Sequence, residues 1–374
     1  MVSDTFLIAS ETWGLKGIPN NPTAWLYTVA KNKAKDLFKH NKIFEEKVKP
    51  LLSNQQETSE ELNFSEQNIT DSQLQMLFSV CNPIISTEAQ ITLALRVLCG
   101  FGIEEIASAF LSNKETINKR LLRAKEKLRK NNVDLVFPTP EELPERLDNV
   151  CSIIYLLFNE GYYTSTSGNT INKELCVEAI RLTYFLLENK QTNQPKTNAL
   201  MALLCFHSSR FEARLNSTGE VILFDNQDRT LWNYELISKG SYYLSLSMEV
   251  PASKFQLEAS ISFLHLQDEN TPNKWNTILQ LYNHLLQLEY SPIVALNRTY
   301  SLAKVKGNDV AIKEALKINL PTNHLYHVLL AELYLPLDKE KQIEHLNKAL
   351  ELAKTEQERR VILDKIKLDK KRIG

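Results

Sequence analysis

The segment from Ile91 to Lys130 limits the possible folds of this chain most strongly, because its breaks divide it into short helices at fixed spacing. A helix predicted to end near Leu98 is followed by Gly100 and Gly102, which permit a sharp turn. A short helix is expected next, at 103–110, and a third after it. Two short helices joined by a tight turn are typical of a helix-turn-helix, a motif that binds DNA.

The third of these helices is basic on one side. Ser112 and Glu115 have the spacing of a capping box, which predicts a helix start at about Asn113. From Lys114 to Lys130 there are eight basic and two acidic residues, a local net charge of +6. At 100° per residue one face is apolar, with Ile117, Leu121, Ala124 and Leu128. Another face, predicted to lie away from Glu115 and Glu126, carries Thr116, Lys119, Arg120, Arg123, Lys127 and Lys130.

A charge-rich helix is more often a solvated surface than a binding site. Here the tight spacing, the cap and the separation of basic from acidic residues favour DNA binding instead. The residues expected to contact bases or phosphates are Thr116, Lys119, Arg120, Arg123 and Lys127.

A second segment, at 21–42, has features that suit a single nucleic-acid strand. Asn21 is a candidate N-cap, with Pro22 at the first helical position. Aromatic and cationic residues alternate on one side, where bases could stack while the backbone is neutralised. Taken alone, the segment also fits an ordinary amphipathic helix. The candidate contacts on it are Asn21, Trp25, Tyr27, Lys31, Asn32, Lys35 and Lys39.

Composition predicts an all-α protein without a catalytic centre. The 374 residues include only 10 Gly and 13 Pro, and the net charge is −1, so positive charge is local rather than global. No phosphate-binding, hydrolase or metalloprotease motif occurs, and we expect no cofactor and no metal. His324 and His327 are one helical turn apart but lack an obvious third ligand. In the sequence Phe158-Asn159-Glu160-Gly161-Tyr162, the glycine is expected to cap a helix rather than form a ligand-binding turn.

Cysteine spacing and hydropathy indicate a cytoplasmic chain. The five cysteines are widely separated and form no C-x-x-C pair, which favours reduced core thiols over disulfides or a zinc site. They are Cys81, Cys99, Cys151, Cys176 and Cys205. No apolar run reaches the length of a membrane span, and the first ten residues lack the layout of a signal peptide.

Two boundaries divide the chain. The acidic, polar stretch at 45–72 is predicted to be a flexible linker. Three prolines within 138–144 mark the start of a C-terminal part at 138–374. This part is expected to be helical, and Leu325 to Leu352 has the texture of a TPR-like hairpin, with Ala331, Tyr334 and Ala349. We expect an α-solenoid-like extension with a concave surface for a partner.

Several blocks, in order along nearly the whole chain, resemble one family. AWLYTVAKNKAKDL at 24–37 is similar to region 2.3–2.4 of an extracytoplasmic-function sigma factor of the sigma-70 family, and residues 88–130 resemble its region 4. Four further blocks resemble the subgroup with a large TPR-like C-terminal extension. They are ELPERLDNVCSIIYLLFNEGYYTS at 142–165, LCVEAIRL at 175–182, LFDNQDRTLWN at 223–233 and SPIVALNRTYSLAKV at 291–305.

The resemblance implies a division into sigma region 2 at 1–44, a linker at 45–72, sigma region 4 at 73–137 and the extension at 138–374. Met1 already falls within what resembles region 2.2, so region 2 is expected to be truncated at its N-terminus. Asp4 and Phe6 are then candidates for contact with core RNA polymerase.

The same resemblance implies how the chain would act. Segment 21–42 would bind the −10 element of promoter DNA and the basic helix the −35 element, with core RNA polymerase as partner. The extension would regulate in cis or bind a regulatory protein. Two alternatives remain: a DNA-binding regulator that acts without polymerase, and a TPR-type interaction scaffold with a vestigial sigma head.

Overall fold

The computed structural model describes residues 66–374 apart from short gaps, together with scattered positions among the first thirty residues. The described early positions are 5, 9, 12–13, 17–19, 21–23, 25–27 and 29–30, and the later gaps are 111, 135, 163–171, 216–221, 223, 268–271, 354–355 and 372–374. The chain divides into two compact units, Met1–Met76 and Leu77–Gly374.

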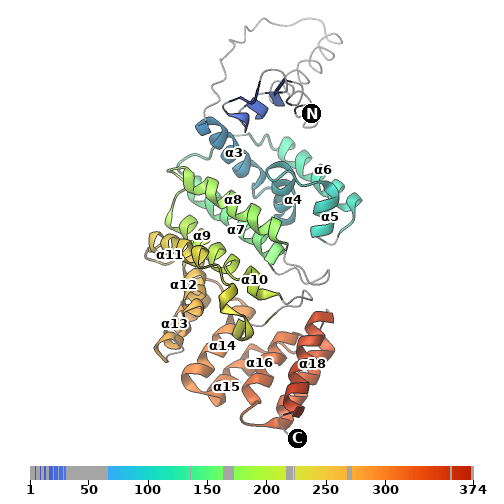
Figure 1. Ribbon diagram of the computed structural model, residues 1–374, viewed down its shortest axis with the longest axis vertical. Coiled ribbons are helices and arrows are strands. Elements are labelled where there is room, and N and C mark those ends of the chain that lie inside the picture. Colours follow the sequence, from blue (N-terminus) through green and yellow to red (C-terminus); the bar gives the residue numbers. More distant parts are fainter. Residues whose placement is uncertain are drawn as a thin grey trace, which may run out of the picture. The chain divides into compact units, whose positions relative to one another are not determined.

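The described residues form helices and the turns that join them, without a strand among them, so the all-α prediction is confirmed for this part of the chain (Figure 1). Ordered along the chain, the α-helices are α3 (Glu66–Val80), α4 (Thr87–Val97), α5 (Ile103–Ala109), α6 (Lys114–Lys130), α7 (Leu143–Tyr162), α8 (Lys173–Glu188), α9 (Pro195–Ser208), α10 (Phe211–Arg214), α11 (Tyr234–Leu246), α12 (Lys254–Leu266), α13 (Pro272–Leu288), α14 (Pro292–Lys306), α15 (Asn308–Ile318), α16 (His324–Tyr334), α17 (Lys339–Leu352) and α18 (Glu356–Lys371). Two 3₁₀ turns, η1 (Phe224–Asn226) and η2 (Arg229–Leu231), precede α11.

Helix α3 begins earlier than the sequence suggested. It starts at Glu66, inside the stretch assigned to the acidic linker, so residues 66–72 are helical. The remainder of that predicted linker lies outside the described residues. The boundary between the two compact units falls within α3, because the second unit starts at Leu77.

The predicted boundary at 138 does not separate two packed bodies, because helices α4–α6 and the extension belong to the same compact unit. Asn149 on α7 donates its amide to Cys81 O at 2.6 Å and to Gln90 Oε1 on α4 at 2.9 Å. Arg181 on α8 donates to Leu98 O at the end of α4 at 2.9 Å. The extension therefore packs directly on α4 and on the residues that flank it.

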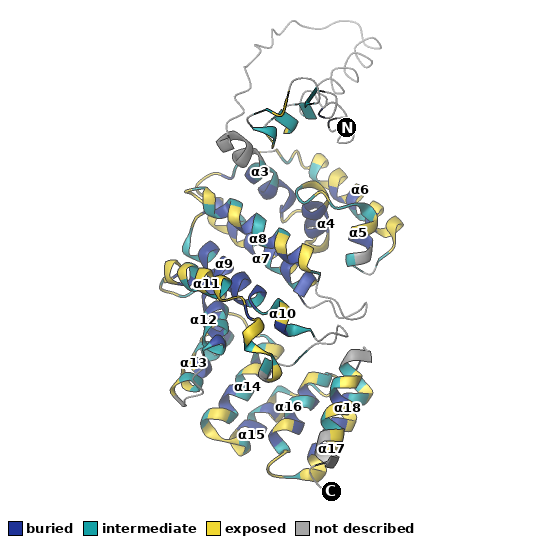
Figure 2. Ribbon diagram, in the orientation of Figure 1, coloured by how far each residue is buried: buried dark blue, intermediate teal, exposed yellow. Residues whose placement is uncertain are grey.

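Helix α9 is the core of the first part of the extension. Its residues from Thr197 to Phe206 are all buried, as expected for a helix that is apolar on every side (Figure 2). It packs against α7, α8, α11 and α12. At Gly240 on α11 an added Cβ would lie 2.6 Å from the Phe206 ring, so only glycine permits this close approach.

From α12 onward each helix packs on the next, which is the arrangement expected of an α-solenoid. The predicted hairpin at 325–352 is present as α16 and α17, joined by a short turn. Ala331 and Ala349 are both buried in the cluster that α16, α17 and α18 share. Asn323 caps α16 by accepting from the N–H of Leu325 at 2.8 Å.

The cysteine prediction agrees with the structure. All five thiols are free, and all but Cys99 are fully buried. Burial raises the pKa of Cys151, Cys176 and Cys205 to about 12, so these thiols stay protonated and unreactive. Within the described residues, no helix combines the length and apolar character that crossing a membrane requires.

Candidate nucleic-acid interface

Local hydrogen bonds form the turns between α4, α5 and α6, the segment in which the sequence predicts a helix-turn-helix. Gly100 has a positive φ of 76°, as expected of the glycine that turns the chain after α4. The Gly102 N–H donates to the Glu105 carboxylate, which closes the first turn of α5. The end of α5 is then fixed by Ser112, whose N–H donates to Ala107 O at 2.8 Å.

The cap of α6 is one residue later than predicted. Asn113 has extended backbone angles, and its side-chain oxygen accepts from the N–H of Thr116 at 2.7 Å. The prediction that Ser112 caps α6 in a capping box was therefore wrong, because the backbone N–H of Ser112 bonds to the end of α5. With Asn113 as the cap, Glu115 lies in the first turn, where a carboxylate is favourable to the helix dipole.

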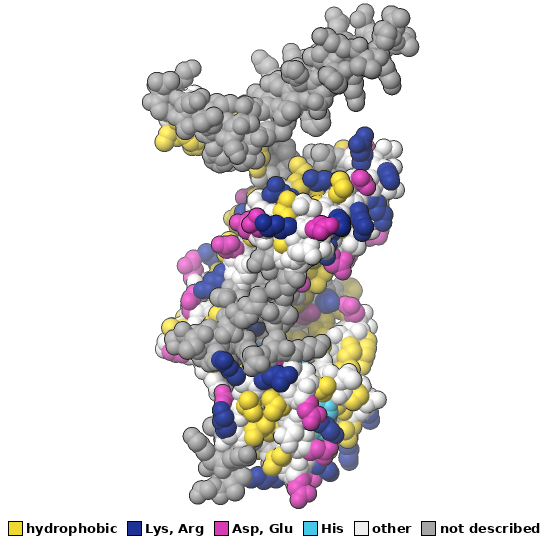
Figure 3. Space-filling view, turned by 90° about the vertical axis from the view of Figure 1, so that its right-hand side faces the viewer, with side chains coloured by type: hydrophobic (Ala, Val, Ile, Leu, Met, Phe, Trp, Pro, Cys, Tyr) yellow, Lys and Arg dark blue, Asp and Glu magenta, His cyan; other side chains and the backbone are white. Residues whose placement is uncertain are grey.

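One face of α6 packs against the neighbouring helices, and the opposite, cationic face lies at the surface. Ile117, Leu121 and Ala124 are buried, as their spacing predicted, and pack towards α4 and α5. The cationic face is on the surface: Lys119, Arg123 and Lys127 are exposed and Arg120 is half-buried. Figure 3 shows Lys and Arg side chains gathered in the part of the surface where α5 and α6 lie, with acidic side chains among them.

The cationic face of α6 and the start of α4 enclose a groove of about 560 Å³. Ile85, Ser86 and Ala89 form one side. The other side contains every residue of α6 that the sequence assigned to DNA contact: Thr116, Lys119, Arg120, Arg123 and Lys127. The structure thus brings all five predicted side chains together, and adds the α4 residues that the sequence did not indicate.

Acidic residues moderate the charge of this groove. Lys119 pairs with Glu115 at 2.6 Å, so the predicted separation of the basic face from Glu115 was wrong at that position. Both side chains are largely exposed, so the pair is worth little and can open at low cost. The pKa of Glu88 is lowered by hydrogen bonds from its own backbone and from Ser86, and also by the charge of Arg120.

Only some of the N-terminal candidates lie among the described residues. Trp25 N–H donates to Asn21 O at 3.2 Å, so Asn21 stands at the start of a helical turn as predicted. The Trp25 ring packs on Trp13, with centroids 5.4 Å apart. Tyr27 is exposed, and its hydroxyl accepts from Gln73 at 2.5 Å. Asp4, Phe6, Lys31, Asn32, Lys35 and Lys39 lie outside the described residues.

The remaining candidates have structural roles. Gly161 lies inside the last turn of α7 without a positive φ, so the predicted glycine cap was wrong. An added Cβ there would lie 2.7 Å from Asn172 O and 2.8 Å from the Cys176 sulfur, which shows that this glycine allows α7 and α8 to approach. The described residues contain no cluster of side chains that could hold a metal ion. His327 pairs with His345 on the next helix, Nδ1 to Nδ1 at 3.0 Å, rather than with His324.

Comparison with known proteins gives two matches. Residues 146–248, which run from α7 to α11, match a family model described as "Family of unknown function (DUF6596)". The chain is also 32% identical over 330 residues to "Uncharacterized protein R00370" of Rhizobium meliloti (strain 1021), covering 86% of this chain and 77% of that protein. No solved structure matches.

Proposed function

Since the chain belongs to the family of the Rhizobium meliloti protein R00370, whose name states no activity, we propose a function from the site itself: a dissociable promoter-recognition subunit of bacterial RNA polymerase. This is the role of an extracytoplasmic-function sigma factor, acting in the cytoplasm. The observation that carries the proposal is the groove between α4 and α6, where four cations and a threonine from one helix face the same space.

The geometry supports docking of α6 in the major groove. Lys119, Arg123 and Lys127 on the cationic face of α6 are exposed, and an α-helix fits the major groove of B-DNA. Arg120 and Arg123 can make bidentate contacts with guanine, while Lys119 and Lys127 neutralise flanking phosphates. The start of α4, at Ser86, would lie beside the same phosphate backbone. This arrangement would read a −35 element.

The N-terminal residues would supply the second contact with promoter DNA. Asn21 and Tyr27 lie at and near the start of a helical segment, and an exposed tyrosine can stack on an unpaired base. Trp25 is the weaker candidate of this set, because its ring already packs on Trp13. We assign this segment to the −10 element.

The extension supplies regulation in this proposal. Asn149 and Arg181 fix α7 and α8 to the two ends of α4, and α4 forms one wall of the DNA groove. A ligand or partner that moved α7 or α8 would shift α4 relative to α6. Regulation in cis therefore requires no separate contact with DNA.

The proposal is tested by binding to core RNA polymerase. Purified core enzyme from a bacterium should capture the full chain, and the captured chain should be displaced by a known sigma factor, because both would use the same surface of the core. Failure to bind core under any salt condition would contradict the proposal.

A second candidate is a DNA-binding regulator that acts without polymerase. It is favoured by one observation: helices α4 to α6 and the extension belong to one compact unit, Leu77–Gly374. Sequence-specific binding of duplex DNA by the chain alone, together with no capture by core enzyme, would support this candidate over the first.

A further inference from the structure

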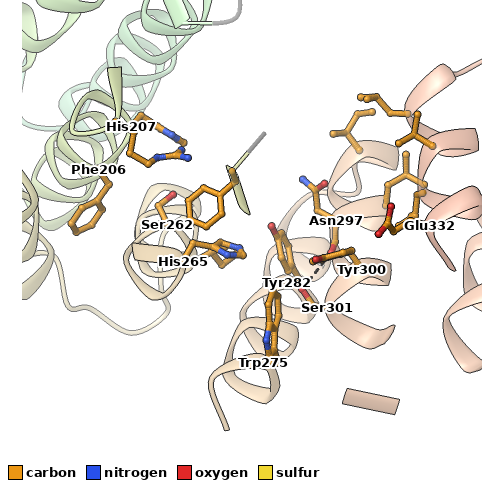
Figure 4. Close-up of a pocket in the computed structure, with 18 of the residues that line it drawn as sticks. Phe206, His207, Ser262, His265, Trp275, Tyr282, Asn297, Tyr300, Ser301 and Glu332 are labelled. Carbon is orange, nitrogen blue, oxygen red and sulfur yellow. Dashed lines mark hydrogen bonds between the residues drawn. The ribbon is translucent and has the colours of Figure 1, made fainter. Parts of the chain in front are cut away.

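A second cavity, of about 590 Å³, lies in the extension, far along the sequence from the DNA groove. Its walls come from α9, η1, α12, α13, α14, α16 and α18. In Figure 4, His207 and His265 stand on one side of the open space and Glu332 on the other, with Tyr282, Trp275 and Tyr300 between them. The volume is that of a site for a small organic molecule.

Aromatic rings form much of this wall. Phe224 and His265 meet edge to face, and so do His265 and Trp275, with ring centroids 5.7 Å apart in each case. Trp275 then meets Tyr300 at the same spacing. A continuous row of rings offers stacking area to a flat ligand and fixes few hydrogen bonds.

Three polar groups at one end of the cavity have less bonding than they could make. Arg210 donates to the Tyr162 hydroxyl at 3.1 Å and lies over the Phe224 ring, but no carboxylate among the described residues pairs with it. His207 has a buried Nδ1 atom without a hydrogen-bond partner. His265 makes ring contacts, but no hydrogen bond of its imidazole is present within the described part of the chain. Of the three, His207 Nδ1 is the buried atom, which would normally have a partner, whereas Arg210 and His265 are half-buried side chains on the cavity wall.

Among the described residues, the charges that act on these two histidines are all cationic. Burial, with the nearby charges of Arg210 and Arg214, lowers the pKa of His207 to about 3. Burial, with Lys274 and Arg210, lowers the pKa of His265 to about 4. Both imidazoles are therefore neutral at neutral pH, and a positive potential remains. At the opposite end Glu332 is already paired with Lys365 at 2.8 Å, so it does not offset that potential.

We propose that this cavity binds a small aromatic anion, with its carboxylate or phosphate at Arg210 and its ring against the Trp275–Tyr300 row. An anionic group would give Arg210 the charged partner that no described carboxylate supplies, and the neutral His265 imidazole could donate to the same group. A cationic ligand would meet uncompensated positive charge. The ligand is small because the site is a cavity bounded on several sides.

The test uses three probes with one ring system and different charge: indole-3-acetate, indole-3-acetamide and tryptamine. Binding to the full chain is measured by calorimetry. Indole-3-acetate should bind at least tenfold more tightly than the neutral acetamide, and tryptamine more weakly than either. Equal affinity for all three, or no binding of indole-3-acetate at millimolar concentration, would overturn the proposal.

Variants locate the binding. Arg210→Gln should weaken indole-3-acetate binding at least tenfold and change acetamide binding less than twofold, whereas Arg210→Lys should keep the preference for the anion. Asn297→Asp adds a negative charge at an exposed residue of the cavity wall. It should weaken binding of the anion by charge repulsion and leave the contacts of Arg210 as they are. Asn273→Asp, exposed on α13 and outside the lining, is its control. If Asn297→Asp and Asn273→Asp bind indole-3-acetate alike, the anion does not lie in this cavity.

Discussion

Replacing the cations of the α6 groove should change the salt dependence of DNA binding by a calculable amount. The variant carries Lys119→Gln, Arg120→Gln and Arg123→Gln, so that only Lys127 of the four groove cations remains. Each phosphate contact contributes about −0.9 to the slope of log affinity against log salt concentration. Four contacts predict a slope of about −3.6, and the variant should retain a slope of about −0.9.

These slopes predict a large and measurable difference. Raising the salt concentration from about 50 to about 200 mM should weaken wild-type binding roughly 150-fold but variant binding only about 3.5-fold. Fluorescence anisotropy of a labelled duplex of about 30 base pairs, titrated with the full chain at several salt concentrations, measures both slopes. The Glu115 pair of Lys119 makes the predicted slope an upper limit, because opening that pair costs a little free energy.

A matched control variant distinguishes the effect of the groove cations from the effect of the total charge of α6. Lys114, Lys125 and Arg129 also lie on α6, but none of them lines the groove. Their replacement by Gln makes the same change in net charge, and it should leave the slope close to that of the wild type. If the control variant loses as much slope as the groove variant, DNA binding is not focused on this groove and the docking mode is refuted.

Three further predictions concern the extension. Gly161→Ala should lower the free energy of unfolding by about 1–3 kcal/mol in urea denaturation, because the added Cβ would lie 2.7 Å from Asn172 O. An unchanged midpoint of the urea transition would show that α7 and α8 can separate freely. The pKa of His265 is lowered from 6.5 to about 4, so the unfolded state binds a proton more readily than the folded state. The free energy of unfolding should therefore fall as pH drops below about 6.5, by about 1.4 kcal/mol per pH unit for this group. His265→Gln should remove that part of the pH dependence, measured by denaturation at pH 7, 6 and 5. Asn149→Ala leaves Gln90 Oε1 without its donor and should cost about 1–3 kcal/mol, while a conserved unfolding midpoint would mean that α4 is held mainly by other contacts.

The sequence predicted features that depend on local periodicity. The buried face of α6, with Ile117 and Leu121, followed from helical spacing alone. The five groove residues followed because they share one azimuth of the same helix. The α16–α17 hairpin was predicted because its two helices are neighbours in the chain and are joined by a short turn.

Features that depend on packing between distant residues were missed. The choice of Asn113 rather than Ser112 as cap depends on where the Ser112 N–H bonds, and both residue types cap helices well. Gly161 resembled a helix cap because only the approach of α8 reveals why a side chain is excluded. The cavity at Arg210 joins α9 to α18 across more than half of the extension, and no local pattern indicates such a meeting.

The measurement that tests the central claim most directly is transcription in vitro, in which bacterial core RNA polymerase receives fragmented genomic DNA of the organism that encodes the chain and the transcripts are sequenced. Core enzyme with the wild-type chain should produce a discrete set of start sites preceded by two shared sequence blocks, and the Lys119, Arg120 and Arg123 variant should lose those starts while the α6 control variant keeps them. Transcripts identical to those of core enzyme alone would contradict the account.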